Sequence, residues 1–98
     1  MRTLRLDGEG WRTTEDFYAA FLAAVEAPDW HGHNLDALRD SIVGGSINKV
    51  EPPFRLSVVG SNAWTPTLAE FMRRVAGIFE EAKQRGINVE LAVVDNDI

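Results

Sequence analysis

The sequence contains no cysteine and no long apolar run, and each absence excludes a class of protein. Without cysteine the chain cannot form disulfides, thiolate nucleophiles or cysteine-type zinc sites. No stretch approaches the roughly 18 consecutive apolar residues that a membrane-spanning helix needs, and the first residues lack the apolar core of a secretion signal. We therefore expect a cytoplasmic protein that has no membrane partner.

Basic residues are in the minority, since 15 Asp and Glu stand against 10 Lys and Arg, for a formal net charge of -5. Direct binding of nucleic acid needs an excess of Lys and Arg to neutralise phosphates, so we expect none. An acidic domain is instead attracted to a basic protein surface. The 98 residues, 45% of them hydrophobic, suffice for one compact core, and we expect a single domain over residues 1–98.

Apolar spacing, capping residues and glycines predict alternating strands and helices. In chain order we expect a strand at 4–6, a helix from Thr13 or Thr14 to before Pro28, a shorter helix from Asn34 to Gly44–Gly45, a strand at 54–59, a long helix from Thr65–Pro66 to Gly86, and a strand at 87–94. The last strand is largely apolar, which predicts the central position in a parallel sheet. The chain is therefore expected to have an α/β fold, a small three-stranded parallel sheet flanked by helices.

The short second helix has features that folding alone does not require. At about 100° per residue it has a core face and a second face, about 100–150° away, that carries Asp36, Arg39, Asp40 and Val43. Asp40 lies near the negative end of the helix dipole and repels Asp36 four residues earlier, so its position opposes local stability. Such a residue is a functional candidate; the alternative is a solvated surface acid offset by Arg39.

The loop before this helix carries an aromatic residue and two histidines. Trp30 either fills the space under the loop or projects as a binding anchor. His31 and His33, followed by Asp36, can alternatively be read as a zinc or manganese site of a small metal-dependent hydrolase. Against that reading, the chain has no HExxH pattern, no third histidine, no nucleophile elbow and no phosphate-binding glycine loop. We therefore expect no catalytic residue, no metal and no cofactor.

The long helix contains two glutamates that each precede an arginine by four residues, Glu70 before Arg74 and Glu81 before Arg85. Side chains at this spacing are neighbours on a helix surface. We expect two surface ion pairs, each of little net value for stability.

The stretch GHNLDALRD at residues 32–40 resembles the G-x-N-L-D-A-L-x-D motif of the barstar family, intracellular inhibitors of the ribonuclease barnase. The likeness extends through nearly the whole chain, with LDGE at 6–9 and FEEAK at 79–83 followed by Gly86. The resemblance implies a three-stranded parallel sheet flanked by helices. It also implies a non-enzymatic inhibitor whose second helix and preceding loop block the active site of a basic ribonuclease or toxin nuclease.

The same resemblance assigns roles to individual residues. Asp40 is expected to occupy a phosphate-binding pocket of the nuclease, with Asp36 and Glu81 as further acidic contacts, so that carboxylates mimic RNA phosphates. The acidic surface would speed encounter, an effect already described for the barnase–barstar pair. The expected partner-binding residues are Trp30, His31, Asn34, Asp36, Arg39, Asp40, Val43, Gly44 and Glu81.

Several positions depart from the family pattern. Arg39 and Gly45 stand where the family has tryptophans, Val43 stands where it has threonine, and Arg85 replaces a glutamate. These changes alter the partner-facing surface and leave the core pattern intact, so the expected target is a cognate nuclease bound one to one by a monomer. A regulatory module that binds a non-nuclease protein is the alternative of a different class.

Overall fold

A computed structural model describes residues 1–45 and 47–95 of the chain. The elements in order are β1 (Arg2–Asp7), α1 (Thr14–Ala24), α2 (Leu35–Arg39), a π-helical turn (Asp40–Gly44), β2 (Phe54–Val59), a 3-10 turn (Ser61–Ala63), α3 (Pro66–Gln84) and β3 (Val89–Val94). The predicted alternation of strands and helices is confirmed. Among the described residues no helix is both long enough and apolar enough to cross a membrane.

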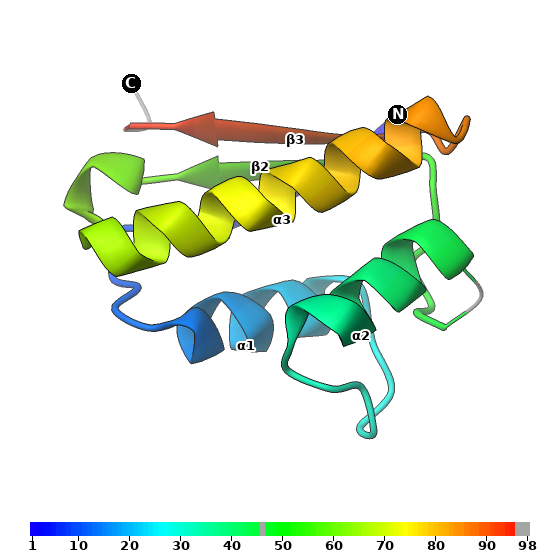
Figure 1. The fold of residues 1–98 in the computed structure, drawn as a ribbon, viewed down its shortest axis with the longest axis horizontal. Helices are drawn as coiled ribbons and strands as arrows, with labels where there is room; N and C mark the ends of the chain where they lie inside the picture. The colour runs from blue at the N-terminus through cyan, green and yellow to red at the C-terminus, as the bar shows by residue number, and fades with distance from the viewer. Residues whose placement is uncertain (46, 96–98) are drawn as a thin grey trace.

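The three strands form one parallel sheet in the order β1-β2-β3. Figure 1 shows β2 and β3 side by side. Leu4, Leu56 and Leu91 lie opposite one another across the sheet. Along β1 and β2, buried apolar residues alternate with exposed ones such as Arg5 and Arg55, because the helices pack against one face. The α/β fold with a three-stranded parallel sheet is therefore confirmed.

The predicted central position of the last strand is wrong, because β2 is the central strand and β3 lies at an edge. Val89 is fully buried, but Val93 and Val94 near the end of β3 are 40% and 41% exposed. An apolar run predicts burial but does not say from which side the burial comes. Here it comes mainly from α3, which packs on β3 and leaves the outer edge of the strand open.

The core lies between the sheet and the helices and includes Phe17, Phe21 and Phe79. Leu38 and Ile42, from α2 and the π-helical turn, are also part of this core, at 0% and 3% exposure. In Figure 1, α3 runs along the strands while α1 and α2 lie on the side away from β3. Apolar contacts therefore fix α2 on the body of the protein and leave its other side exposed.

The helix ends follow the predicted local signals. Thr13 is the N-cap of α1, and the Asp16 carboxylate accepts a hydrogen bond from the Thr13 backbone N–H at 3.0 Å. Thr65 Oγ1 accepts from Leu68 N at 3.1 Å at the start of α3. Gly86 follows α3 with φ 86°, a left-handed conformation that glycine adopts without strain. These residues fix where α1 begins and where α3 begins and ends.

Candidate functional site

The start of α2 is built by one side chain and one buried contact. Asn34 Oδ1 accepts a hydrogen bond from Ala37 N at 2.8 Å, which satisfies a backbone donor that the first turn leaves unpaired. Leu38, one turn later, is fully buried. The predicted N-cap role of Asn34 is confirmed, and its side chain is used within the chain.

The end of the helix differs from the prediction of one regular helix from Asn34 to Gly44. Residues Asp40–Gly44 form a π-helical turn, which is wider than an α-helical turn, and Gly45 follows with φ 73°. Val43, expected on the exposed face, is only partly exposed and packs against the core. Gly44, the last residue of this turn, is exposed.

The two aspartates of α2 and its turn are exposed. Neither the Asp36 nor the Asp40 carboxylate forms a hydrogen bond or ion pair with any of the residues that the structure describes. Arg39 lies between them in sequence but does not pair with either. Their negative charges still act on the Arg39 guanidinium and, behind the larger effect of Glu81, raise its pKa. The acids are therefore available to a partner without breaking an internal bond.

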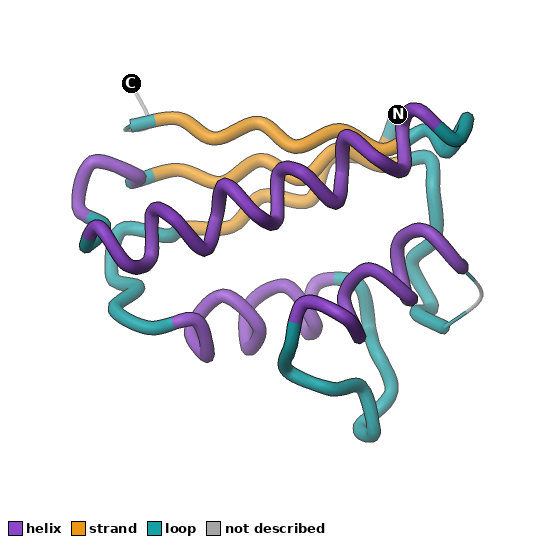
Figure 2. The backbone as a smooth tube through the Cα atoms, viewed as in Figure 1, coloured by secondary structure: helices purple, strands orange, loops and turns teal. Residues whose placement is uncertain are grey.

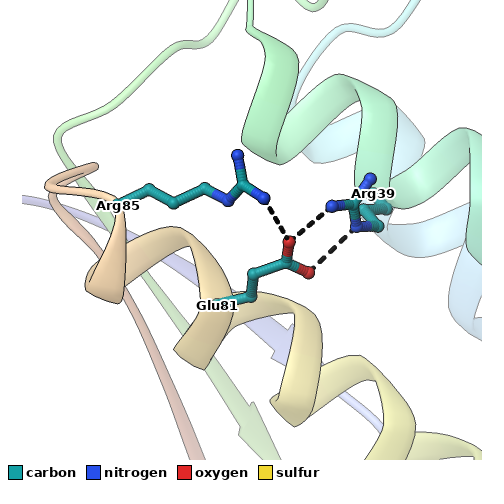
Figure 3. A network of polar contacts seen from close by, with 3 residues as sticks. All are labelled: Arg39, Glu81 and Arg85. Carbon is teal, nitrogen blue, oxygen red and sulfur yellow. Dashed lines mark hydrogen bonds and ion pairs between the residues drawn. The ribbon is translucent and has the colours of Figure 1, made fainter.

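Arg39 binds Glu81 of α3 instead (Figure 3). Its Nε and Nη2 donate to Oε1 and Oε2 of Glu81 at 2.9 and 2.5 Å, a two-point contact between α2 and α3. Arg85 Nη2 lies 3.2 Å from Glu81 Oε2, so the predicted Glu81–Arg85 pair is confirmed. The hydrogen bond from Arg39 is the main cause that lowers the pKa of Glu81. The spacing of 42 residues between Arg39 and Glu81 gave no local signal for this pair.

The loop between α1 and α2 projects away from the sheet (Figure 2). Trp30 in this loop is 74% exposed, so it does not fill the space beneath the loop. Its neighbour His31 is only 5% exposed, and Nδ1 donates to the Gly32 carbonyl at 2.8 Å. The imidazole of His31 is therefore not part of the exposed surface, contrary to its place in the expected partner-binding set. Trp30 is thus exposed and the adjacent His31 is buried, and the sequence did not predict which of the two would be exposed.

His33 ties the loop to the first helix. Its Nδ1 lies 2.6 Å from Glu15 Oε2, and its ring stacks on Tyr18 with the centroids 5.6 Å apart. His31 and His33 thus have separate partners rather than a common centre. Within residues 1–45 and 47–95, no group of three or more His, Cys, Asp or Glu side chains is placed to hold a metal ion.

The sequence was compared with models of known protein families. The family model described as Barstar (barnase inhibitor) matches residues 1–95, nearly the whole chain. A comparison with curated proteins finds no match. The parallel three-stranded sheet with helices on it agrees with this family, whose members are inhibitors rather than enzymes and bind a ribonuclease as protein partner. The chain belongs to the barstar (barnase inhibitor) family.

Proposed function

We propose that this protein inhibits a ribonuclease by covering the active site with the exposed side of α2 and the loop before it. The observation that carries the proposal is the pair Asp36 and Asp40, two exposed carboxylates with no partner among the described residues. An active site that binds RNA presents cationic groups to phosphates. The two carboxylates offer such groups charge-assisted hydrogen bonds in place of the substrate.

Rigidity supports this use of the two acids. The buried Leu38 and the Asn34 cap hold α2 in place before any partner arrives. A surface that is already ordered loses less conformational entropy on binding, and more of the interaction energy contributes to affinity. The remaining acidity of the chain, with its net charge of -5, would accelerate encounter with a basic enzyme.

Trp30 supplies the apolar part of the proposed interface. Its side chain is the most exposed of the large hydrophobic residues in the described chain. Exposed tryptophans that become buried at the centre of an interface often dominate binding energy. Trp30 is therefore the proposed anchor beside the two acids, and Gly44 contributes exposed backbone. The inhibitor would act as a monomer, one per nuclease, in the cytoplasm that it protects.

The test compares two substitutions that each remove one negative charge. Asp40→Asn changes the proposed interface, and Glu70→Gln changes an exposed acid of α3 that pairs with Arg73 and Arg74. Inhibition of RNA cleavage is titrated with barnase and a panel of barnase-type ribonucleases. We expect the wild type to inhibit at least one of them, and Asp40→Asn to weaken that binding by about 100-fold or more. Glu70→Gln should retain nearly full affinity.

Thermal unfolding of both variants serves as the folding control. Equal affinity of Asp40→Asn and wild type would contradict phosphate mimicry by Asp40. Absence of inhibition across the whole panel would contradict the proposed function.

A further inference from the structure

Two arginines from different elements converge on one carboxylate beside the acids of α2. This Glu81 cluster consists of Arg39 on α2, Glu81 on α3 and Arg85 at the end of α3 (Figure 3). Arg39 makes a two-point contact with Glu81, and Arg85 approaches the same carboxylate at 3.2 Å. The side chains are 44%, 31% and 58% exposed for Arg39, Glu81 and Arg85. The cluster is thus ordered and open to a partner.

The hydrogen-bonding capacity of the cluster is unequal between its members. Both oxygens of Glu81 already accept from arginine. A guanidinium carries about five N–H donors, so most of those of Arg39 and Arg85 are not used by Glu81. The cluster therefore offers a partner chiefly donors, and Glu81 acts through Arg39 by holding its guanidinium against α3.

The charge of the cluster has the opposite sign to that of its surroundings. Two arginines and one glutamate carry a net formal charge of +1, within a chain of net charge -5. A protein that covers the α2 surface would remove this excess positive charge from water. Burial of a charge without a counter-charge is unfavourable, and a bidentate carboxylate is the partner that suits a guanidinium best. Asp36 and Asp40 do not supply this carboxylate, because neither forms an ion pair with Arg39 in the described structure.

We propose that the Glu81 cluster is a binding site for an Asp or Glu side chain of the target ribonuclease, an inference that rests on the proposed function. Arg39 and Arg85 bind the carboxylate, and Glu81 is a positioning residue. An RNA phosphate is disfavoured as the occupant, because the exposed Asp36 and Asp40 beside the cluster repel a polyanion. A protein can place one carboxylate here while it presents cations to the two aspartates. The cluster would thereby select nucleases that carry an acid at this point.

The test selects binding partners from a library of barnase variants, because the natural target is not identified. Catalytically inactive barnase is displayed on yeast with the surface around its active site randomised, and binders are isolated with three baits. The baits are the wild type, Arg39→Met, and Arg73→Met, which removes an arginine paired with Glu70 elsewhere on α3. We expect the wild type and Arg73→Met to enrich Asp or Glu at one randomised position, and Arg39→Met to lose that enrichment.

Binding measurements on the selected barnase variants then separate positioning from a general structural role. Replacing the enriched acid by its amide should weaken binding to the wild type by about tenfold or more, and binding to Arg39→Met far less. Glu81→Gln should weaken binding only of those barnase variants that carry the acid. A structural role of Glu81 would weaken binding of all variants alike.

Other outcomes overturn the inference. Equal acid enrichment with wild-type and Arg39→Met baits would exclude the carboxylate site while leaving the proposed function intact. If none of the three baits isolates a barnase variant that binds, the proposed function is contradicted as well. Binding of a short RNA that Arg39→Met abolishes would assign the cluster to phosphate instead.

Discussion

Two clusters that include a glutamate of helix α3 each contain one glutamate and two arginines, and they differ in which elements they connect. The Glu70 cluster consists of Glu70, Arg73 and Arg74, all on α3, with Arg74 Nε 3.8 Å from Glu70 Oε1 and Arg73 also paired to Glu70. In the Glu81 cluster, Arg39 comes from α2 and makes a two-point contact across the helix interface. The Glu70 side chain is 51% exposed and that of Glu81 is 31% exposed. The same residue types therefore form a local surface pair in one place and a link between elements in the other.

The ion pairs of the Glu70 cluster lie within one helix, whereas the Arg39–Glu81 pair orients a side chain of the proposed interface. Pairs within one exposed helix gain little because water screens them and long side chains lose entropy. The Arg39–Glu81 contact is also partly exposed, so we expect it to add little stability and to act by fixing the direction of the Arg39 guanidinium. The stability of α2 should then come from apolar burial and capping, and the ion pairs should matter chiefly for binding.

The largest expected effect tests what holds α2 in place. Leu38→Ala removes a fully buried side chain from the underside of the helix. We expect a loss of unfolding free energy of about 2–5 kcal/mol, because the substitution leaves a cavity in the core. Urea denaturation of Leu38→Ala and Arg39→Met would check this. A larger loss for Arg39→Met would show that the Glu81 cluster, rather than the core, anchors α2.

The next effect compares two helix caps. Asn34→Ala removes the acceptor for Ala37 N, and Thr65→Ala removes the acceptor for Leu68 N. Each should lower the unfolding free energy by about 1 kcal/mol. Only Asn34→Ala should also weaken inhibition of a ribonuclease, because it loosens the helix that carries Asp36 and Asp40. Equal loss of inhibition in the two variants would mean that global stability, not the order of α2, limits binding.

The sequence predicted those parts of the fold that depend on local signals. The cap at Asn34, the Thr65–Pro66 start of α3 and its end before Gly86 follow from backbone chemistry within a few residues. The edge position of β3 was not predicted, because a run such as Val89–Val94 does not specify on which side neighbouring strands lie. The π-helical turn at Asp40–Gly44 was not predicted either, because a helix face drawn at a constant 100° per residue treats every turn as α-helical.

The candidate site shows the same division. The exposure of Asp36 and Asp40 was predicted from the buried face of their own helix. The inward position of His31 and the pairing of Arg39 with Glu81 depend on contacts made after the chain folds. Charge and spacing thus predicted which face of α2 is exposed, but they did not reveal which charges on that face are paired within the chain.

A smaller effect is the pH dependence of the Arg39–Glu81 contact. The hydrogen bond from Arg39 holds the pKa of Glu81 below its ordinary value of 4.5. Because the folded pKa is the lower one, the ionised carboxylate favours the folded state above the unfolded value, and this contribution is lost as the pH falls through the folded value. The stability difference between wild type and Glu81→Gln should therefore be greatest near neutral pH and shrink below about pH 4.5.

Urea denaturation at a series of pH values measures this difference. Glu70→Gln is the matched control. Because it keeps Glu81, it should still lose unfolding free energy as the pH falls, as the wild type does. A difference between wild type and Glu81→Gln that stays constant to low pH would contradict a role for the ionised Glu81 carboxylate.

The smallest expected effect is that of Arg73→Met. Arg73 is 74% exposed and pairs with Glu70 on the same helix, three residues earlier. Its removal should change the unfolding free energy by no more than about 0.5 kcal/mol, because exposed pairs on one helix have little net value. Inhibition should be unchanged, whereas Arg39→Met should alter it, although both variants lose one arginine from a Glu–Arg pair. If the two variants change inhibition equally, net charge determines binding, and the contact of Arg39 with Glu81 on the other helix does not.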